Sequence, residues 1–374
     1  MRRTMARAVL ALACVTLGAA LVPAPLCGRD ADALFDGERD AQDALARGVI
    51  ASIDDGSASF STGSELFDGE WAVATHQMAI LGLGQIVLAH PELRGEYLPP
   101  MRAAADRLVA DETLRFGRTM WGDAPLEGLP GGEGHAYLGY VNLALGMMRL
   151  VDPETPHAAL HDRLTDALAR RLDRAPHGLF ETYPGQSFPP DVAAVAASIG
   201  LHQRATGRDH SALLARWSAR FRARWIDRSG YLVQRGDPRS GRALDAPRGS
   251  GTAVAAYFLS YADPTLSRVL YEGLARHGHA TLAGFGAIGE FAPGHDGHGD
   301  IDSGPVILGV GLLATGFAIG AARAHGDRAR YRELVRTAVL FGVPVERDRG
   351  RRFLAGGAIG NAILLAMLTA PELS

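Results

Sequence analysis

The sequence predicts an all-α fold, an (α/α)6 toroid built from six helical hairpins. Two observations predict it. Hydrophobic residues recur mainly at helical spacing along the chain after residue 28, and the helices defined in this way alternate between two kinds. One kind is almost uncharged and rich in alanine and glycine, whereas the other has an arginine-rich face. A helix that is apolar all round must be buried and an amphipathic helix can cover a core, so the alternation predicts an inner ring inside an outer ring.

Twelve helices follow from this periodicity, with boundaries accurate to a few residues. The nearly uncharged stretches include residues 192–201, 251–259, 306–322 and 358–370. Each hairpin then takes about 50–60 residues, as expected of two helices and their connections. The predicted helices span residues 30–53, 70–90, 95–111, 134–151, 155–174, 190–206, 208–227, 249–262, 264–280, 303–324, 326–342 and 355–370.

Strand signals are few, and one helix has an alternative interpretation. Residues 230–235 followed by the turn at 238–241 predict a short β-hairpin between ring helices. The apolar segment 306–322 also resembles a membrane span, with Gly316 and Gly320 forming a pair of small residues. Its length is marginal for a span, and several similar helices occur in the chain, so we favour the buried ring helix.

The N-terminus is predicted to direct export. A positive segment, residues 1–7, precedes an apolar segment, residues 8–22, which is typical of a signal peptide. Residues 1–27 are therefore expected to be a signal peptide or an N-terminal membrane anchor, with lipidation at Cys27 as an alternative. Residues 28–374 form the single toroid domain, and the protein is expected to be periplasmic or membrane-anchored and facing the periplasm.

Composition narrows the function classes. The 374-residue chain has a net charge of −3, and its basic residues alternate with acidic ones at helical spacing. Nucleic-acid binding would need a clustered basic face, so no nucleic-acid partner is expected. Both cysteines, Cys14 and Cys27, lie in the leader region, so the toroid domain is expected to have no disulfide, no cysteine metal site and no cysteine nucleophile.

The loops that lead into the nearly uncharged helices are expected to form a site, because such loops converge on one mouth of a toroid. They are rich in glycine, proline, aromatic and acidic residues, unlike the connections on the other side. The loop 181–191 contains Glu181 and Asp191, whose pKa values could separate into those of an acid and a base. Asp191 could equally cap the following helix.

A second acid-rich loop, residues 293–305, carries Asp300 and Asp302. We expect at least one of them to face the substrate, and helix capping is the alternative. His295, Asp296, His298 and Asp300 suggest a metal site, but their spacing matches no established metal-binding motif. The prediction is therefore a site without metal or cofactor.

The remaining predicted site residues contact a substrate rather than react with it. Arg248 could bind an anion or pair with one of the acids, and Ser250 opens the next inner helix. Ser250 has no strand-turn-helix context for a nucleophile. A lone His76 is more often a core residue than a base. The other predicted substrate-binding residues, mostly aromatic, are Trp121, Asp123, Tyr137, Tyr140, Asn142 and Tyr183.

Short motifs across residues 70–370 resemble the bacterial linalool dehydratase-isomerase family. They lie in the same order as in the family and span residues 121–123, 137–146, 225–241 and 257–264. The resemblance implies an exported (α/α)6 barrel that removes or moves a hydroxyl on a terpene alcohol without a cofactor. The family's two cysteines and one histidine are replaced here by Glu181, Pro190 and Tyr140, so its cysteine mechanism does not transfer.

The predicted function is cofactor-free acid/base chemistry, of dehydratase or isomerase type, on a small hydroxylated molecule that is terpenoid-like or sugar-like. Glu181 would donate or accept the proton, with Asp191, Asp300 or Asp302 as its partner. One alternative is a glycoside hydrolase or lyase, because paired carboxylates are the usual tools of sugar cleavage. A second alternative is a non-catalytic binding or envelope protein.

Overall fold

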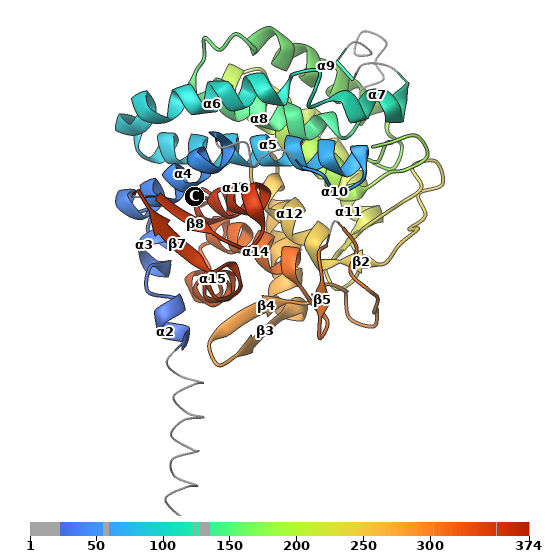
Figure 1. The fold of residues 1–374 in the computed structure, drawn as a ribbon. Coiled ribbons are helices and arrows are strands. Elements are labelled where there is room, and N and C mark those ends of the chain that lie inside the picture. Colours follow the sequence, from blue (N-terminus) through green and yellow to red (C-terminus); the bar gives the residue numbers. More distant parts are fainter. Residues whose placement is uncertain are drawn as a thin grey trace, which may run out of the picture.

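In the part of the chain that the structure describes, six inner helices form a closed ring, as predicted (Figure 1). The computed structural model describes residues 23–54, 60–122, 125–126, 135–301, 303–348 and 350–373. Each inner helix contacts the next one along the chain, and the last contacts the first. The inner helices are α5 (Glu65–Ala89), α8 (Leu138–Val151), α10 (Pro189–Thr206), α12 (Gly249–Leu259), α14 (Leu312–Ala324) and α16 (Gly357–Leu368).

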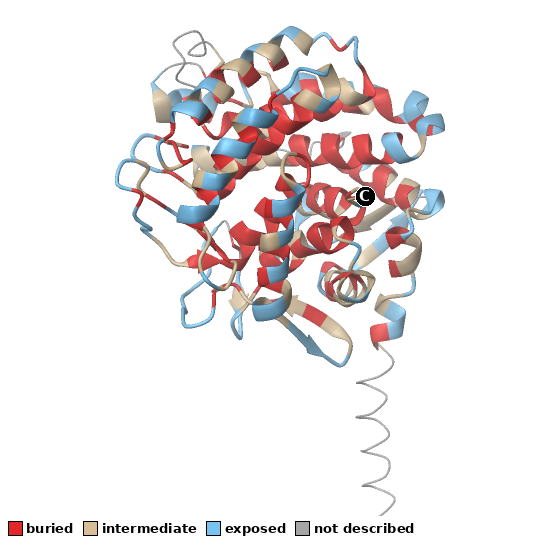
Figure 2. Ribbon diagram, turned by 180° about the vertical axis from the view of Figure 1, so that it is seen from behind, coloured by how far each residue is buried: buried red, intermediate tan, exposed pale blue. Residues whose placement is uncertain are grey.

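Six outer helices cover this ring and alternate with the inner ones along the chain. Their buried residues form one stripe, whereas the inner helices are buried over most of their surface (Figure 2). This is the physical reason for the two kinds of helix in the sequence. The outer helices are α4 (Arg39–Asp54), α6 (Arg94–Leu108), α9 (Ala158–Arg174), α11 (Ser211–Trp225), α13 (Pro264–Gly273) and α15 (Arg328–Gly342).

Short elements fill the connections. The helical ones are α2 (Pro23–Cys27), α3 (Ala31–Phe35), η1 (Pro91–Leu93), α7 (Arg115–Trp121) and the π turn η3 (Leu274–Gly278). The strands form four antiparallel pairs, which are β1 (Leu232–Val233) with β2 (Pro247–Arg248), β3 (His279–Leu282) with β4 (Phe285–Ile288), β5 (Val306–Ile307) with β6 (Val310–Gly311), and β7 (Pro344–Arg347) with β8 (Gly350–Phe353).

Three predicted helices differ from the structure. The helix predicted at 30–53 is divided into α3 and α4, and the one predicted at 264–280 ends at Gly273. The helix predicted from residue 303 begins only at Leu312, because Leu308 and Gly309 adopt positive φ and turn the chain into the β5–β6 hairpin. The predicted 230–241 hairpin is also wrong in register, since β1 pairs with residues 247–248 instead.

The membrane-span interpretation of 306–322 is wrong, because these residues form a hairpin and part of a 13-residue helix whose second half is buried. Among the described helices, α5 alone is long and apolar enough to cross a membrane. Within its most apolar 18-residue window, 78% is buried inside the ring. Its apolar character is therefore accounted for by its place in the core.

Glycines allow the inner helices to approach one another closely. At each seam of the ring, a Cβ added to a glycine would lie within about 3 Å of the neighbouring helix or of the residues just beyond its end. At Gly200 on α10 the obstacle is backbone, with the Tyr261 carbonyl oxygen at 2.5 Å. The glycines that serve the six seams are Gly82, Gly84, Gly139, Gly200 and Gly320.

A polar contact spans the ring at the end away from the loops discussed below. The Gln85 side-chain amide on α5 accepts from the hydroxyls of Tyr257 and Tyr261, and it donates to Thr369 Oγ1 at 2.7 Å. These groups are buried, so each would cost free energy if it were left without a partner. The network therefore ties α5 to α12 and to the end of α16.

Replacing Gly200 by alanine is expected to destabilise the fold by about 1–3 kcal/mol, because the new methyl group would meet fixed backbone. Gly316 on α14 is the matched control, since an added Cβ there has nothing within 4 Å. G316A should stabilise the helix by about 0.5–1 kcal/mol. Chemical denaturation of both variants checks this, and equal effects of the two substitutions would contradict the close packing of α10.

Candidate active site

A cavity of about 330 Å³ lies at the mouth of the ring, between the N-terminal halves of the six inner helices. Its wall is mainly apolar and aromatic, with a few polar groups, which is the usual composition of a small-molecule site. The lining residues are Leu66, Phe67, Glu70, Trp71, Ala74, Gln77, Met78, Tyr137, Tyr140, Tyr183, Gln186, Phe188, Pro190, Asp191, Gln234, Ser250, Gly251, Val254, Ile301, Leu313, Phe317, Ile359 and Ile363.

The first carboxylate of the cavity is Asp191, in the first turn of α10. Tyr140 on α8 donates its hydroxyl proton to Asp191 Oδ1 at 2.6 Å, and Thr182 donates to Oδ2 at 2.8 Å. The helix N-terminus favours a negative charge at this position. Burial and the nearby Asp191 charge raise the pKa of Tyr140 well above its usual value, so the phenol remains a neutral donor.

The second carboxylate, Glu70 on α5, was not predicted. Its Oε1 accepts a hydrogen bond from Tyr183, and its backbone carbonyl accepts one from Tyr137 at 3.2 Å. Burial, followed by the charges of Tyr137 and Glu70, raises the pKa of Tyr183 far above its usual value. The cavity thus has two carboxylates, each held by a tyrosine hydroxyl that is neutral at every physiological pH.

A third acid, Glu290, lies behind the wall and was also not predicted. It is fully buried, and Ser250 donates its hydroxyl proton to Glu290 Oε1 at 2.6 Å. Oε2 has no hydrogen-bond partner within the described structure. Burial raises the pKa of Glu290 to about 7, although the hydrogen bond from Ser250 and the charge of Arg248 oppose the rise.

Two glutamines give the cavity unpaired polar groups. Gln77 is fully buried, and neither atom of its amide has a partner in the part of the chain that is described. Gln234 likewise has a buried, unpaired Oε1. Buried polar atoms are almost always paired in native structures. Gln77 therefore offers one donor and one acceptor to a bound molecule.

Several predicted site residues support the cavity from outside it. Trp121 stacks on Tyr183, with ring centroids 5.4 Å apart, and donates to the Thr182 carbonyl at 3.1 Å. Asn142 is fully buried and donates to Thr165 and Ser198, which joins α8 to α9 and α10. Glu181 is not among the lining residues, and its backbone carbonyl accepts from Ala136 at 3.1 Å.

The acid-rich loop is braced by an ion pair. Arg248 bonds to Asp300, whose Oδ1 also accepts from the Ser303 backbone at 2.8 Å. Burial alone would raise the pKa of Asp300, but these bonds hold it below its usual value. Neither Arg248 nor Asp300 lines the cavity, whereas Ile301 from the same loop does. Asp123 and Asp302, also predicted site residues, lie outside the described residues.

Histidines do not assemble into a metal site in the described part of the chain, where no group of three or more His, Cys, Asp and Glu residues is placed to hold a metal ion. His76 is buried on α5, and burial, assisted by Arg107, lowers its pKa to about 4. Its imidazole is therefore neutral at physiological pH. His76 is absent from the cavity lining.

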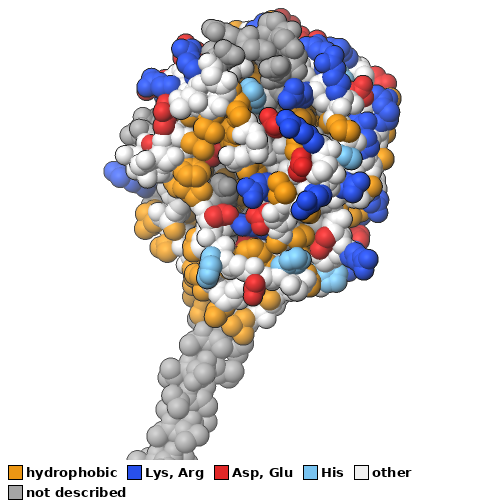
Figure 3. Space-filling model, turned by 90° about the vertical axis from the view of Figure 1, so that its right-hand side faces the viewer, with side chains coloured by type: hydrophobic (Ala, Val, Ile, Leu, Met, Phe, Trp, Pro, Cys, Tyr) orange, Lys and Arg blue, Asp and Glu red, His pale blue; other side chains and the backbone are white. Residues whose placement is uncertain are grey.

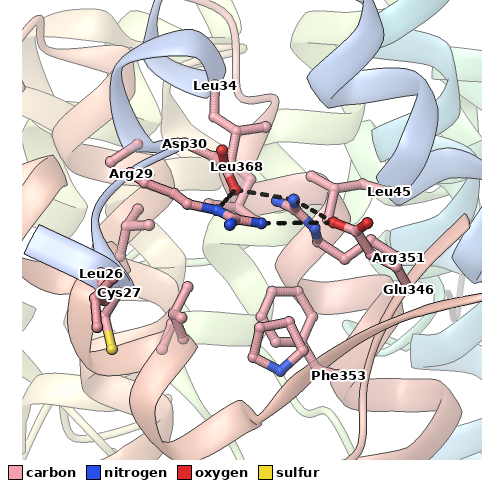
Figure 4. Close-up of a pocket in the computed structure, with 15 residues that line it drawn as sticks. Leu26, Cys27, Arg29, Asp30, Leu34, Leu45, Glu346, Arg351, Phe353 and Leu368 are labelled. Carbon is pink, nitrogen blue, oxygen red and sulfur yellow. Dashed lines mark hydrogen bonds and ion pairs between the residues drawn. The ribbon is translucent and has the colours of Figure 1, made fainter. Parts of the chain in front are cut away.

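A second cavity, of about 350 Å³, lies between the N-terminal segment, α15 and the β7–β8 hairpin (Figure 4). Its charged groups already pair with one another, since Arg351 lies 2.9 Å from both Asp30 and Glu346. Burial raises the pKa of the nearby Cys27 thiol, which lowers its reactivity. Although this cavity is slightly larger, none of the described residues that line it has a buried, unpaired polar side-chain atom, unlike Gln77 and Gln234 at the ring mouth.

On the face shown in Figure 3, arginines lie among acidic side chains, and hydrophobic side chains gather over another part of the same face. No continuous basic patch is visible on that face.

No family model and no curated protein matches the chain. Among solved structures, the unsaturated glucuronyl hydrolase of Bacillus sp. GL1, described as responsible for the degradation of glycosaminoglycan, is similar over 89% of this chain and 96% of that chain. The two chains are 14% identical, with a TM-score of 0.49. The resemblance to linalool dehydratase-isomerases thus stays a prediction from short sequence matches.

Replacing Glu290 by glutamine is expected to change how stability depends on pH. A carboxyl whose folded-state pKa is raised from 4.5 to about 7 stabilises the fold below pH 4.5, and this contribution is lost as the pH rises through 7. The difference in unfolding free energy between wild type and E290Q should therefore shift by at most about 3 kcal/mol between pH 4.5 and 8, in favour of E290Q at the higher pH. Thermal melts across this range check it, with E181Q as the control.

Proposed function

We propose that the protein is an enzyme that performs acid/base chemistry, dehydration or isomerisation, on a neutral and largely apolar alcohol. One observation carries the proposal: a mainly apolar cavity at the ring mouth contains two carboxylates, each hydrogen-bonded to a tyrosine hydroxyl. Paired acid and base groups that face one cavity are the requirement for such a reaction. The resemblance to the linalool dehydratase-isomerase family agrees with this chemistry.

The residues divide into two proton-transfer groups. Asp191, with Tyr140 and Thr182, is suited to accept a proton from a substrate carbon or hydroxyl, because its charge is stabilised by donors and by the α10 N-terminus. Glu70 and Tyr183 form the second group. In a dehydration, one group protonates the departing hydroxyl, which leaves as water, and the other removes a proton from the adjacent carbon.

The cavity composition favours a neutral substrate. Among the described residues that line it there is no arginine or histidine, so an acidic sugar would meet two carboxylates and no cation. Phe67, Trp71, Phe188 and Phe317 instead offer apolar contact area. Gln77 supplies the donor and acceptor that would orient a hydroxyl.

Sugar cleavage is the second candidate, and the two carboxylates at one cavity favour it. An aromatic side chain such as Trp71 would suit a sugar ring as well as a terpene. A cavity filled by side chains, which would favour a non-catalytic envelope protein, is not found at the ring mouth of the described structure.

A ligand-stabilisation and turnover screen distinguishes these functions. Neutral terpenoid alcohols such as linalool and geraniol should raise the melting temperature and be converted to products that have lost or moved the hydroxyl. D191N and E70Q should each lower kcat about 10²–10⁴-fold, while E181Q should leave it unchanged. Stabilisation and cleavage of neutral or acidic oligosaccharides, with no effect of alcohols, would replace this proposal by the second candidate.

Export is part of the proposal and rests on the charged and apolar segments of residues 1–22, which lie outside the described residues. The expected result is periplasmic localisation of the full chain, in soluble or membrane-attached form. Deleting residues 2–22 should retain the protein in the cytoplasm. Fractionation with a C-terminal tag measures this, and unchanged localisation of the deletion variant would contradict it.

A further inference from the structure

A buried carboxyl, that of Glu290, lies behind the cavity wall and belongs to neither of the two proton-transfer groups described above. Glu290 follows β4, and its backbone holds it between β2 and β6. Its amide donates to the Gly309 carbonyl at 2.9 Å, and its own carbonyl accepts from Gly249 at 2.6 Å. A Cβ at Gly311 would lie 2.3 Å from Glu290 Oε2, so a glycine at this position leaves room for the carboxyl. The side chain is held in place and fully buried.

Ser250 connects this carboxyl to the cavity. Ser250 lines the cavity, and its hydroxyl donates to Glu290 Oε1 at 2.6 Å. A serine hydroxyl has two lone pairs besides its proton, so it can accept from a second group while donating to Glu290. Glu290 itself is not among the cavity-lining residues, so Ser250 is its contact with the cavity.

Other charged or titratable groups surround Glu290 but do not satisfy both of its carboxyl oxygens with hydrogen bonds. Arg248 interacts with it through charge, but the guanidinium is bonded to Asp300. Asp300 opposes ionisation of Glu290, and burial, followed by the charge of Glu290, raises the pKa of Tyr231. Neither the Tyr231 hydroxyl nor Glu290 Oε2 has a hydrogen-bond partner among the described residues. A purely structural carboxylate would be expected to have both oxygens paired.

We infer that Ser250 and Glu290 form a proton relay between the cavity and a buried carboxyl. The Ser250 hydroxyl accepts a proton from a substrate group while its own proton moves to Glu290 Oε1. The serine ends as a neutral hydroxyl, the carboxylate becomes a neutral acid, and the substrate has lost one proton. The reverse transfer returns the proton. As a catalytic element the relay rests on the proposed function, whereas its proton site can be measured without a substrate.

The first experiment titrates the carboxyl directly. Infrared difference spectra of the full chain between pH 5 and 9 should contain a protonated-carboxyl band that disappears with a midpoint near 7. The band should be absent from E290Q, and S250A should move its frequency and midpoint because the hydrogen bond to Oε1 is lost. S260A is the matched control, since Ser260 follows the other end of α12 and donates to the Tyr257 carbonyl. A spectrum without a band that depends on Glu290 would overturn the relay.

The second experiment separates the relay from the proposed function by using turnover of the alcohol found in the screen. S250A should lower kcat at least tenfold with little change in KM, whereas S250T, which keeps the hydroxyl, should retain activity. E290Q should remove the limb of the kcat–pH profile near 7. Normal turnover with an unchanged pH profile in S250A and E290Q would reject the relay and leave the proposed function intact. A Glu290 band without turnover of any alcohol would reject the function and leave the proton site.

Discussion

Close packing of the six inner helices is the constraint on which the rest of the structure depends. A glycine at every seam lets neighbouring helices approach until backbone or side-chain atoms meet, as Gly200 does at the end of α12. Such packing closes the ring with all six helices pointing the same way, because each inner helix is followed by an outer helix that returns the chain. Their N-terminal halves therefore surround one cavity.

This arrangement determines the electrostatics of the site. The N-terminus of α10 favours a negative charge at Asp191, and the Tyr183 hydroxyl donates to Glu70, so both carboxylates can lie in a mainly apolar cavity. Burial disfavours the charged form of Glu290 and raises its pKa, and Glu290 Oε2 has no hydrogen-bond partner among the described residues. Two carboxylates that line the cavity and a buried carboxyl behind its wall thus lie around one space.

The sequence predicted most of the helices because the inner helices are nearly uncharged and the outer helices have an arginine-rich face. It also placed five of the cavity-lining residues, Tyr137, Tyr140, Tyr183, Asp191 and Ser250, at the entrances to inner helices. It missed Glu70, because in the sequence Glu70 resembles the neighbouring acids Glu65 and Asp68 at the start of α5. Glu290 could have been noticed, because it is the only charged residue between Phe285 and Ala292. An isolated acid within an apolar stretch is a reason to expect a buried carboxyl.

The sequence by itself determined the fold class, since helical periodicity and alternating burial are local properties of the chain. Only the tertiary structure decided which loop residues share the cavity. Glu181 and Asp191 are ten residues apart in the sequence, yet Asp191 lines the cavity and Glu181 does not. Glu70 and Tyr183, far apart in the chain, meet there. Side-chain direction at a helix entrance depends on the neighbouring helices, and no local pattern encodes that contact.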